Sequence, residues 1–506
     1  MRSKKALRNI IFDLLLQFVA IIYGFVVPRI IIGYFGSEVN GLVSSITQFL
    51  SYIALFESGF GPVVRATLYK PIADKNRTVV LRILRTAEDF FRRIALIFLV
   101  YILVLCFIFP FITQMDFEPL FTAVLILVIG ISTFAEYFFG MTYKLYLRAK
   151  QETYVISLVQ LVTYILCIVA VVLLTTSGAN IIIVKAVTGL VFTIRPLALN
   201  YYVHRKYNIS LQNVKSGYPI KQKWDGLAQH IASVIHSHTD VVVLTLCASL
   251  TDVSIYSVYY LVVKGVKDLV LAFTNSIDAP FGDMLAKNEI TNLNKKFAAY
   301  EVMFCTIATI LFTCVIVLIT PFVSVYIGSN PDADYYQPLF GVLIVISEYI
   351  CIIRTPYNKL TYAAGHFKET RTGAWVECIL NIVISVILVW NFGIIGVAIG
   401  TIVAMAVRAA EFMYHSSRYI LNRPIAVCVG KVLLIAAETL VIMLISNFLP
   451  FLQNTDFFNL FVNAIIIFAM ACLIVIPVNA FVFKNEFRML IDTVFNIARR
   501  RKKDGR

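Results

Sequence analysis

Nine lysines and arginines lie inside long apolar stretches of this 506-residue sequence. A charge at the middle of a bilayer costs about 2.5–3.5 kcal/mol on insertion scales, so such residues usually face the protein interior, pair with an acid or line a polar path. Lysine presents a point charge to an anion, and arginine presents a planar fork that suits phosphate oxygens. These residue types therefore predict a site that binds an anion within the membrane.

The stretch YSVYYLVVKGVKDL, residues 256–269, contains two of these charges. Its apolar span begins near Asp252, so a rise of 1.5 Å per residue puts Lys264 about 18 Å below the outer surface, close to mid-membrane. Helical spacing predicts one stripe on this helix that contains Tyr256, Tyr260 and Lys264. Lys267 and Asp268 follow about one turn further into the membrane. The alternative is structural, because Lys264 and Asp268 are four residues apart and could neutralise each other.

Arg195 and Arg354 lie about fifteen and sixteen residues below the outer ends of their spans; Arg195 directly precedes a proline, and Arg354 lies two residues before one. Proline frees a backbone carbonyl, which is tolerated where it lines protein or water. Both arginines are therefore candidates for the same polar path. The alternative is an ion pair between helices, with Glu136 or Glu348 as the acid.

Simpler roles are expected for most other intramembrane cations. Arg29 is a site candidate near the outer end of the first span, but its long side chain could also extend to the headgroups. The side chains of Lys185 and Lys431, near span ends, are expected to extend to the membrane surface, and that of Lys359 to reach the cytoplasmic headgroups. Arg408 is expected to form an ion pair with Glu411, three residues further along the same helix.

Carboxylates in the same runs are candidates for binding a proton or sodium ion: Glu57, Asp240 and Asp268. Glu57 begins ESGFGPVVR, residues 57–65, whose glycines and proline would let the second span bend and pack closely. Glu57 and Arg65 are about two turns apart and can share the inward face of this span. The alternative is a helix kink with two separate pairs between helices.

The elements that position these residues are transmembrane helices. Hydrophobic residues make up 59% and charged residues 14% of the chain, whereas soluble domains carry about 25% charged residues. A spanning helix needs about 20 mostly apolar residues, and fourteen runs qualify. Their limits are 7–34, 41–69, 93–113, 119–142, 153–175, 180–203, 227–248, 252–283, 297–320, 338–362, 373–390, 393–415, 425–449 and 457–483. The sequence therefore predicts an all-α integral membrane protein.

The basic residues divide between the two sides of these spans. Of the 44 lysines and arginines, 35 fall in the two terminal tails and every second loop, counted with the adjoining ends of the spans, and the intervening loops have none. Basic residues mark cytoplasmic loops, so both termini are predicted to be cytoplasmic. The net charge of +15 therefore reflects the basic residues of the cytoplasmic side, and we expect no nucleic-acid partner.

The longest internal linker follows the sixth span, which suggests two halves. The predicted divisions are a six-helix bundle at 1–203, a cytoplasmic linker at 204–226, a second six-helix bundle at 227–422, two further helices at 423–483 and a basic tail at 484–506. Residues 135–153 and 347–370 each contain Glu-Tyr, then Lys-Leu, then a polar turn ending in Glu-Thr. Such a repeat would relate two bundles of the same orientation, a layout used by transporters.

Motifs of enzymes are absent from the sequence: it contains no phosphate-binding P-loop and no GxSxG, and the external loops are short. The nine cysteines lie singly, without CxxC spacing, and predict no metal site.

Three stretches together resemble polysaccharide flippases of the multidrug/oligosaccharidyl-lipid/polysaccharide (MOP) exporter superfamily. ESGFGPVVRATLYKPIAD is similar to the second helix and following loop of that family, and HSHTDVVVLTLCASLTDVSIYSVYYLV to its hairpin of helices seven and eight. RTPYNKLTYAAGHFKETRTGAWVECILNIVISVILVWNFGIIGVAIGT is similar to its helices ten to twelve. The resemblance implies fourteen helices, arranged as two six-helix bundles in an inverted V plus two C-terminal helices.

The resemblance also implies a function: a flippase in the bacterial plasma membrane that moves an undecaprenyl-diphosphate-linked oligosaccharide to the outer leaflet for cell-surface polysaccharide biosynthesis. We then expect a cationic passage for the diphosphate, tyrosines that stack on sugar rings, and no cofactor beyond coupling to protons or sodium. The residues are Lys264, Lys267, Arg354, Arg195 and Arg29 for the diphosphate, and Tyr256 and Tyr260 for the sugars. Membrane lipids and polysaccharide polymerase machinery are the other expected partners.

Two other functions remain open at this stage. One is a cation-coupled multidrug exporter of the same superfamily, which should have an acidic, apolar cavity. The other is a membrane glycosyltransferase or polymerase, which would need catalytic carboxylates or histidine in an external loop.

The charge distribution makes a topological prediction. Single cysteines placed at Ser329 and Asn454 should react with an impermeant thiol reagent added outside intact cells, and one at Ser216 should react only from the inside. Labelling of position 216 from outside would contradict the fourteen-span topology.

Overall fold

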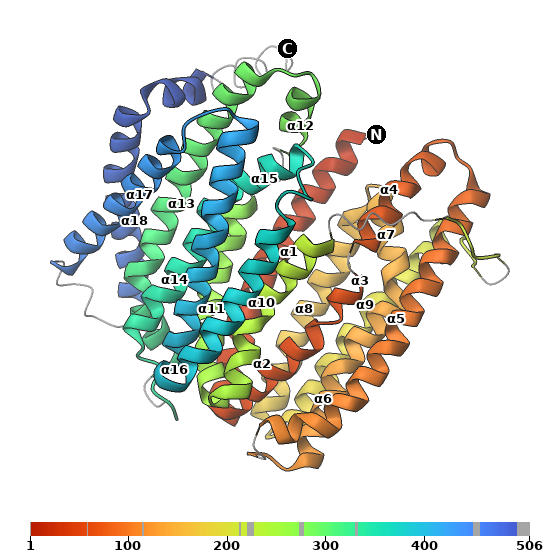
Figure 1. Ribbon diagram of the computed structural model, residues 1–506. Coiled ribbons are helices and arrows are strands. Elements are labelled where there is room, and N and C mark those ends of the chain that lie inside the picture. Colours follow the sequence, from red (N-terminus) through yellow and green to blue (C-terminus); the bar gives the residue numbers. More distant parts are fainter. Residues whose placement is uncertain are drawn as a thin grey trace. The chain divides into compact units, whose positions relative to one another are not determined.

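The computed structural model describes residues 2–57, 59–113, 116–211, 214–219, 227–272, 278–328, 332–448 and 456–492, and its regular structure there is entirely helical (Figure 1). Contacts divide the chain into two units, Met1–Ser257 and Val258–Arg506, so the boundary falls within helix α11. The bundle divisions expected from the sequence remain predictions. Parts of the predicted linker (212–213 and 220–226) and tail (493–506) lie outside the described residues.

The described residues of the first unit form ten helices, one π-helical turn and the beginning of α11. Their bounds are α1 (Arg2–Phe35), α2 (Ser37–Ser51), α3 (Ala54–Glu57), α4 (Phe60–Ala73), α5 (Arg77–Ile112), α6 (Pro119–Ala135), η1 (Glu136–Gly140), α7 (Met141–Ala149), α8 (Thr153–Thr176), α9 (Ile181–Tyr207), α10 (Leu227–Cys247) and α11 (Leu250–Ala272). Within this unit α1 packs on α8, and α6 packs on both α5 and α9. Side chains of Asn76 and Asn180 cap the first turns of α5 and α9 by accepting hydrogen bonds from Val79 and Ile183.

The second predicted span is bent, as its glycines and proline suggest. It is divided into α2, α3 and α4, and Gly59 before α4 has a left-handed backbone with φ of 75°. The fourth span, α6 to α7, is interrupted by the π-helical turn η1. Such turns occur often at functional sites. The proposed repeat counterpart, α14 to α15, is also interrupted, at Arg354.

The described part of the second unit contains the remainder of α11, the helices α12 to α18 and further helical residues at 484–492. Their bounds are α12 (Asp278–Ala286), α13 (Ile290–Ile327), α14 (Pro338–Ile353), α15 (Thr355–Ala363), α16 (Arg371–His415), the π-helical turn η3 (Ser416–Ile420), α17 (Ala426–Asn447) and α18 (Phe457–Val482). In this unit α13 packs on α14, α17 and α18, and α14 packs on α16.

Helix α16 is two helices that fold back on each other at Gly393. This glycine has φ of 52° and ψ of −131°, which is outside the helical region. Asn381 Nδ2 donates to Thr401 Oγ1 at 2.9 Å, although a straight helix would separate residues twenty apart by about 30 Å. The two spans predicted at 373–390 and 393–415 therefore correspond to the two arms of α16.

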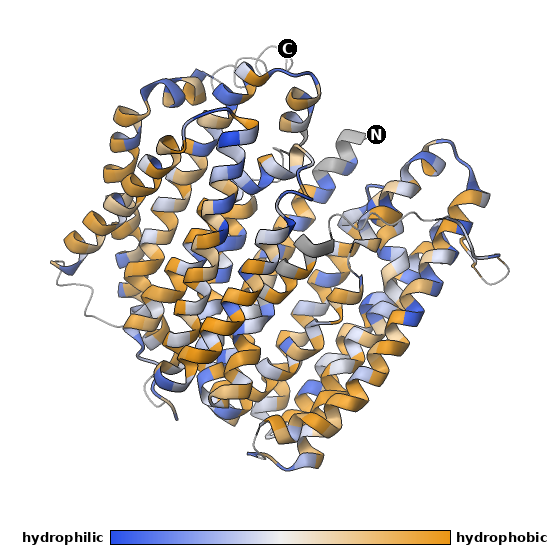
Figure 2. Cartoon of the chain, in the orientation of Figure 1, coloured by the Kyte–Doolittle hydropathy of each residue, from blue (hydrophilic) through white to orange (hydrophobic). Residues whose placement is uncertain are grey.

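Within the described residues, eleven helices are long and apolar enough to cross a membrane, and hydrophobic residues run along most of their length (Figure 2). One of the eleven contains both arms of α16. The predicted spans at 227–248 and 252–283 correspond to α10 and α11, which are not among the eleven. The chain is thus a multi-pass membrane protein by its helices, and fourteen crossings remain a prediction.

A tight contact between α2 and α11 makes a prediction about Gly41. A Cβ on Gly41 of α2 would lie 1.8 Å from the carbonyl oxygen of Leu250, at the start of α11. Two hydrogen bonds of 2.7 Å lie nearby on α2: Asn40 donates to Ser254 of α11, and Ser45 pairs with Thr245 of α10. Because α2 must move away from a backbone atom, Gly41→Ala should lower the free energy of unfolding by about 1–3 kcal/mol.

Thermal unfolding of the purified protein in detergent measures this effect. The matched control is Gly33→Ala in α1, because nothing lies within 4 Å of a Cβ at Gly33. Equal stability of the two variants would contradict the tight contact between α2 and α11.

Candidate functional site

Arg195 lies inside the first unit without a carboxylate partner among the described residues. Its Nε donates to Thr163 Oγ1 at 2.6 Å, and its guanidinium lies 4.5 Å from the ring centre of Tyr164 and 4.2 Å from that of Phe192. Its Nη2 is buried and makes no hydrogen bond within the described part of the chain. Aromatic faces attract a cation but do not cancel its charge, so Arg195 remains a positive centre.

The ion pair of Arg195 with Glu136, which the sequence left open, is not formed. Glu136 instead binds Lys144, with 2.6 Å between Oε1 and Nζ. A void of about 10 Å³ lies between these residues and Arg195, which is the size of one water molecule. In this conformation Arg195 therefore has no pocket large enough for a sugar phosphate beside it in its own unit.

The other predicted site residues of the first unit are distributed over several helices. Arg29 is exposed on α1, and Glu57 at the end of α3 accepts a hydrogen bond of 3.0 Å from the hydroxyl of Tyr137. On α10, buried Asp240 accepts a 2.8 Å hydrogen bond from the hydroxyl of Tyr256. The ring of Tyr256 is thus buried against α10 in this structure, and it does not line an open surface.

In the second unit, Lys264 and Lys267 of α11 have different environments. Lys267 Nζ lies 2.7 Å from Glu348 Oε2 of α14, and this carboxylate is buried. Lys264 is exposed and has no ion-pair or hydrogen-bond partner among the described residues. Asp268 is also exposed and makes no pair with Lys264. Of the cations predicted on this helix, Lys264 is therefore the one whose charge the described residues leave uncompensated.

Arg354 belongs to a chain of buried ion pairs, and its partner differs from the predicted one. Its Nη1 lies 3.1 Å from Oε1 of Glu377, whose Oε2 lies 3.1 Å from Nε of Arg408. Arg408 also pairs with Glu411, as the spacing of three residues predicted, and donates to the carbonyl oxygen of Thr370 at 2.9 Å. Only 2% of the Arg408 side chain is exposed, so the chain of pairs joins α16 to the start of α15 from inside the unit.

A second buried cluster corrects the prediction that Lys431 extends to the surface. Lys431 is buried and pairs with Glu301 of α13, whose side chain is completely buried. Both carboxylate oxygens of Glu301 also accept from Arg423 at 3.0 Å, and the hydroxyl of Tyr357 donates to the same carboxylate. The cluster fastens α13, α15 and α17 to one another.

Sequence reasoning overlooked the acids that hold these clusters. Glu301 and Glu377 are single carboxylates within apolar runs, and so is Glu438, which accepts a 2.9 Å hydrogen bond from Asn479. The cost of an ionisable group in the membrane applies to carboxylates as well as to cations, so this signal was available.

Comparison with solved structures identifies the fold. The structure resembles that of the lipid II flippase MurJ in an inward closed conformation, with a TM-score of 0.67 and 16% identity over 93% of this chain and 99% of that chain. It also resembles an inward-facing multidrug resistance MATE family transporter of the MOP superfamily, with a TM-score of 0.60 and 15% identity over 79% of this chain and 95% of that one. A Vibrio cholerae MATE transporter gives a TM-score of 0.51 and 16% identity over 84% and 98% of the two chains.

No protein-family model and no curated protein sequence matches the chain. The structural likeness extends over nearly the whole length of the flippase and of both transporters. The chain therefore has the fold of MOP superfamily transporters.

The shared carboxylate of Glu377 predicts a difference between two otherwise similar variants. Glu377→Gln leaves the buried charges of Arg354 and Arg408 without their common acid, and the free energy of unfolding should fall by about 3–5 kcal/mol. Glu411→Gln removes an acid that is 28% exposed, so its cost should be about 0–1 kcal/mol. Thermal or denaturant unfolding in detergent measures both, and equal losses would show that Glu377 is not the central link.

Proposed function

We propose that this protein is a flippase that moves an undecaprenyl-diphosphate-linked oligosaccharide from the cytoplasmic to the outer leaflet of the bacterial plasma membrane. It supplies repeat units for cell-surface polysaccharide biosynthesis. The observation that carries the proposal is a fold shared with a lipid II flippase over 93% of this chain, together with an exposed, uncompensated lysine on α11. The similar structures are transporters and flippases, which supports transport over glycosyl transfer.

The charges of the second unit support an anionic substrate. Pairing with Glu348 and Glu377 neutralises Lys267 and Arg354 at least in part, so these cations hold helices together in the conformation described. Lys264 is exposed without such a partner among the described residues and is the candidate to hold a diphosphate. Its ammonium group would bind phosphate oxygens by charge-assisted hydrogen bonds. The other predicted ligands, Arg195, Arg29, Tyr256 and Tyr260, remain part of the proposal.

The membrane potential favours the proposed direction of transport. An anion that moves outward gains about 2.3 kcal/mol per charge per 100 mV of inside-negative potential. The lipid tail can stay in the bilayer, so only the diphosphate and sugars need a polar passage. Exchange for protons or sodium ions through Glu57, Asp240 or Asp268 is an additional source of driving force in this proposal.

A cation-coupled multidrug exporter is the second candidate function. One observation favours it: Asp268 is exposed on α11 and has no cationic partner among the described residues. A cationic drug would use Asp268, whereas a diphosphate would use Lys264. The two functions therefore predict opposite sensitivities at positions four residues apart.

Lys264 is the first position to test. In vesicles with undecaprenyl-diphosphate-linked oligosaccharide, Lys264→Ala should lower the rate of translocation at least tenfold, because a charge-assisted hydrogen bond is worth about 1.5–3 kcal/mol. Lys264→Arg should retain part of the rate because the charge is kept. Adding Asp268→Ala to Lys264→Ala should not restore transport, because the structure contains no pair between these side chains.

Lys287→Ala is the matched control, since Lys287 is an exposed cation of the same unit that pairs with Asp283. It should transport at the wild-type rate. Recovery in the double variant would make Lys264 a structural pair, and unchanged transport in Lys264→Ala would remove it from the site. Export of cationic drugs that depends on Asp268 would favour the second candidate function.

A further inference from the structure

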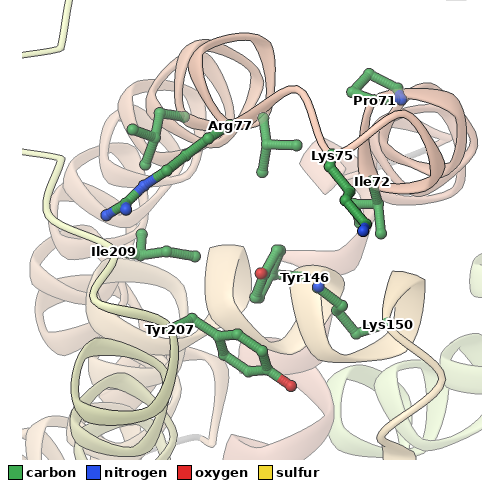
Figure 3. Close-up of a pocket in the computed structure, with 10 residues that line it drawn as sticks. Pro71, Ile72, Lys75, Arg77, Tyr146, Lys150, Tyr207 and Ile209 are labelled. Atoms are coloured by element: carbon green, nitrogen blue, oxygen red, sulfur yellow. The ribbon is translucent and has the colours of Figure 1, made fainter.

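A cationic pocket lies at one end of the first unit, away from the residues discussed so far. It is formed where α4 ends, α5 begins, α7 turns into α8, and α9 ends (Figure 3). Its volume is about 220 Å³. The polar side chains that line it are Lys75, Arg77, Lys150, Tyr146 and Tyr207, and Ile72 and Ile209 lie among its apolar walls. All of these segments belong to loops or helix ends that the charge distribution predicts to be cytoplasmic.

The chain positions Lys75 by an unusual backbone conformation. Lys75 follows the end of α4 with φ of 54°, in the left-handed region, and Asn76 then caps α5. Glycine adopts this conformation with less strain than lysine, so the backbone alone does not account for a lysine here. The turn directs the Lys75 side chain toward Lys150, and their amino groups lie on the same side of the pocket, opposite Arg77 (Figure 3).

Glu152, a buried acid bonded to Tyr207 of the pocket wall, has partners for both carboxylate oxygens. Glu152 Oε1 lies 2.6 Å from Lys5 Nζ, and Oε2 accepts from Lys206 Nζ at 2.9 Å and from the Tyr207 hydroxyl at 2.6 Å. Burial by itself would raise the pKa of Glu152, but the hydrogen bonds from Lys5, Tyr207 and Lys206 lower this pKa to about 2. Glu152 is therefore ionised, and its charge is already matched by two lysines that do not line the pocket.

No carboxylate of the described residues forms an ion pair with the three cations of the pocket. Lys150 Nζ lies over the rings of Tyr207 and Tyr146, at 5.0 and 5.8 Å from their centres. Burial lowers the pKa of Lys150, and repulsion by Lys5 and Lys206 acts in the same direction against the attraction of Glu152. The Arg77 guanidinium donates to the carbonyl oxygen of Asn208 at 2.6 Å, which leaves its charge in place.

Lys75 has no partner among the described residues, and the neighbouring acid, Asp74, is exposed and makes no pair with it. The Tyr146 hydroxyl likewise makes no hydrogen bond within the described part of the chain and faces the pocket (Figure 3). The three positive charges around the cavity repel one another, and an anion would relieve this repulsion and accept a hydrogen bond from the hydroxyl.

We propose that this pocket binds a phosphate group, with Lys75, Lys150 and the Tyr146 hydroxyl as donors and Arg77 as the cation of the opposite wall. Phosphate oxygens match these donors, since they accept charge-assisted hydrogen bonds from ammonium and guanidinium groups. A water molecule takes about 30 Å³ of liquid, so 220 Å³ also holds the atoms next to a phosphate. Ile72 and Ile209 offer those atoms an apolar contact. The ligand is therefore a phosphate ester, either the headgroup of an anionic lipid or a soluble ester.

The site is independent of the proposed transport site. None of the residues that line the pocket is among those proposed to bind the transported substrate. Binding of phosphate at Lys75 and Lys150 can therefore be present or absent whatever substrate the protein moves.

The test measures binding to the full-length protein in a zwitterionic detergent by calorimetry, with two probes. Inorganic phosphate represents a soluble source, and short-chain phosphatidic acid represents a lipid headgroup. We expect wild-type protein to bind at least one probe, and Lys75→Gln and Lys150→Gln each to weaken binding about tenfold. The matched control is Lys70→Gln, because Lys70 is an exposed cation of the last turn of α4 that does not line the pocket.

Lys75→Gly is a second variant that separates loss of binding from loss of folding. Glycine suits φ of 54° at this position, so Lys75→Gly should keep or raise the thermal stability while it still weakens binding. Binding of phosphatidic acid alone would identify a lipid headgroup as the ligand, and binding of both probes with similar affinity would identify a soluble ester. The proposal is overturned if wild-type protein binds neither probe, or if Lys70→Gln weakens binding as much as Lys75→Gln does.

Discussion

The neutralisation of charge inside an apolar helix bundle is the constraint on which the second unit depends. Glu377, Glu301 and Glu348 are all buried, and each holds at least one cation from another helix or from the far arm of its own helix. A buried ion pair adds little net stability compared with apolar residues, but removal of one partner is costly because the other charge stays buried. These pairs therefore link particular helices to one another, and they add little to the overall stability.

The same constraint separates structural charges from candidate functional ones. Lys267, Arg354, Arg408 and Lys431 have carboxylate partners, so their positions are explained without a ligand. Lys264 and Arg195 have none among the described residues, and they differ in their surroundings. Arg195 lies between aromatic rings next to a void the size of a water molecule, whereas Lys264 is exposed. A charge that is both uncompensated and accessible is the kind that an ionic substrate can use, and this is why Lys264 carries the proposed function.

The cationic pocket shows that uncompensated charge is not confined to the spans. At the end of the first unit, Glu152 forms ion pairs with Lys5 and Lys206. These pairs link the starts of α1 and α8 to the end of α9. Lys75, Arg77 and Lys150 line the adjacent cavity, and none of them forms an ion pair with an acid among the described residues. The membrane constraint does not apply there, because water can solvate a cation. The convergence of three cations on one cavity instead indicates an anionic ligand.

Features that depend on local spacing could be predicted from the sequence, and features that depend on the rotation of helices could not. Apolar run length indicated the helices, the glycines of residues 57–65 indicated the bend at Gly59, and the break near Gly393 indicated two arms where α16 folds back. The pair of Arg408 with Glu411 was also predicted, because three residues along one helix bring side chains together whatever the tertiary structure. Ion pairs between different helices were not predicted correctly. The pair of Lys267 with Glu348 was not foreseen, and the acid suggested for Arg354 was not Glu377. Lys431 was expected at the membrane surface but is buried against Glu301. Each of those contacts requires two helices to present particular faces at the same depth, and a linear spacing contains neither the rotation nor the register. Tertiary structure alone therefore decided which charges are bound within the protein and which remain available to a ligand.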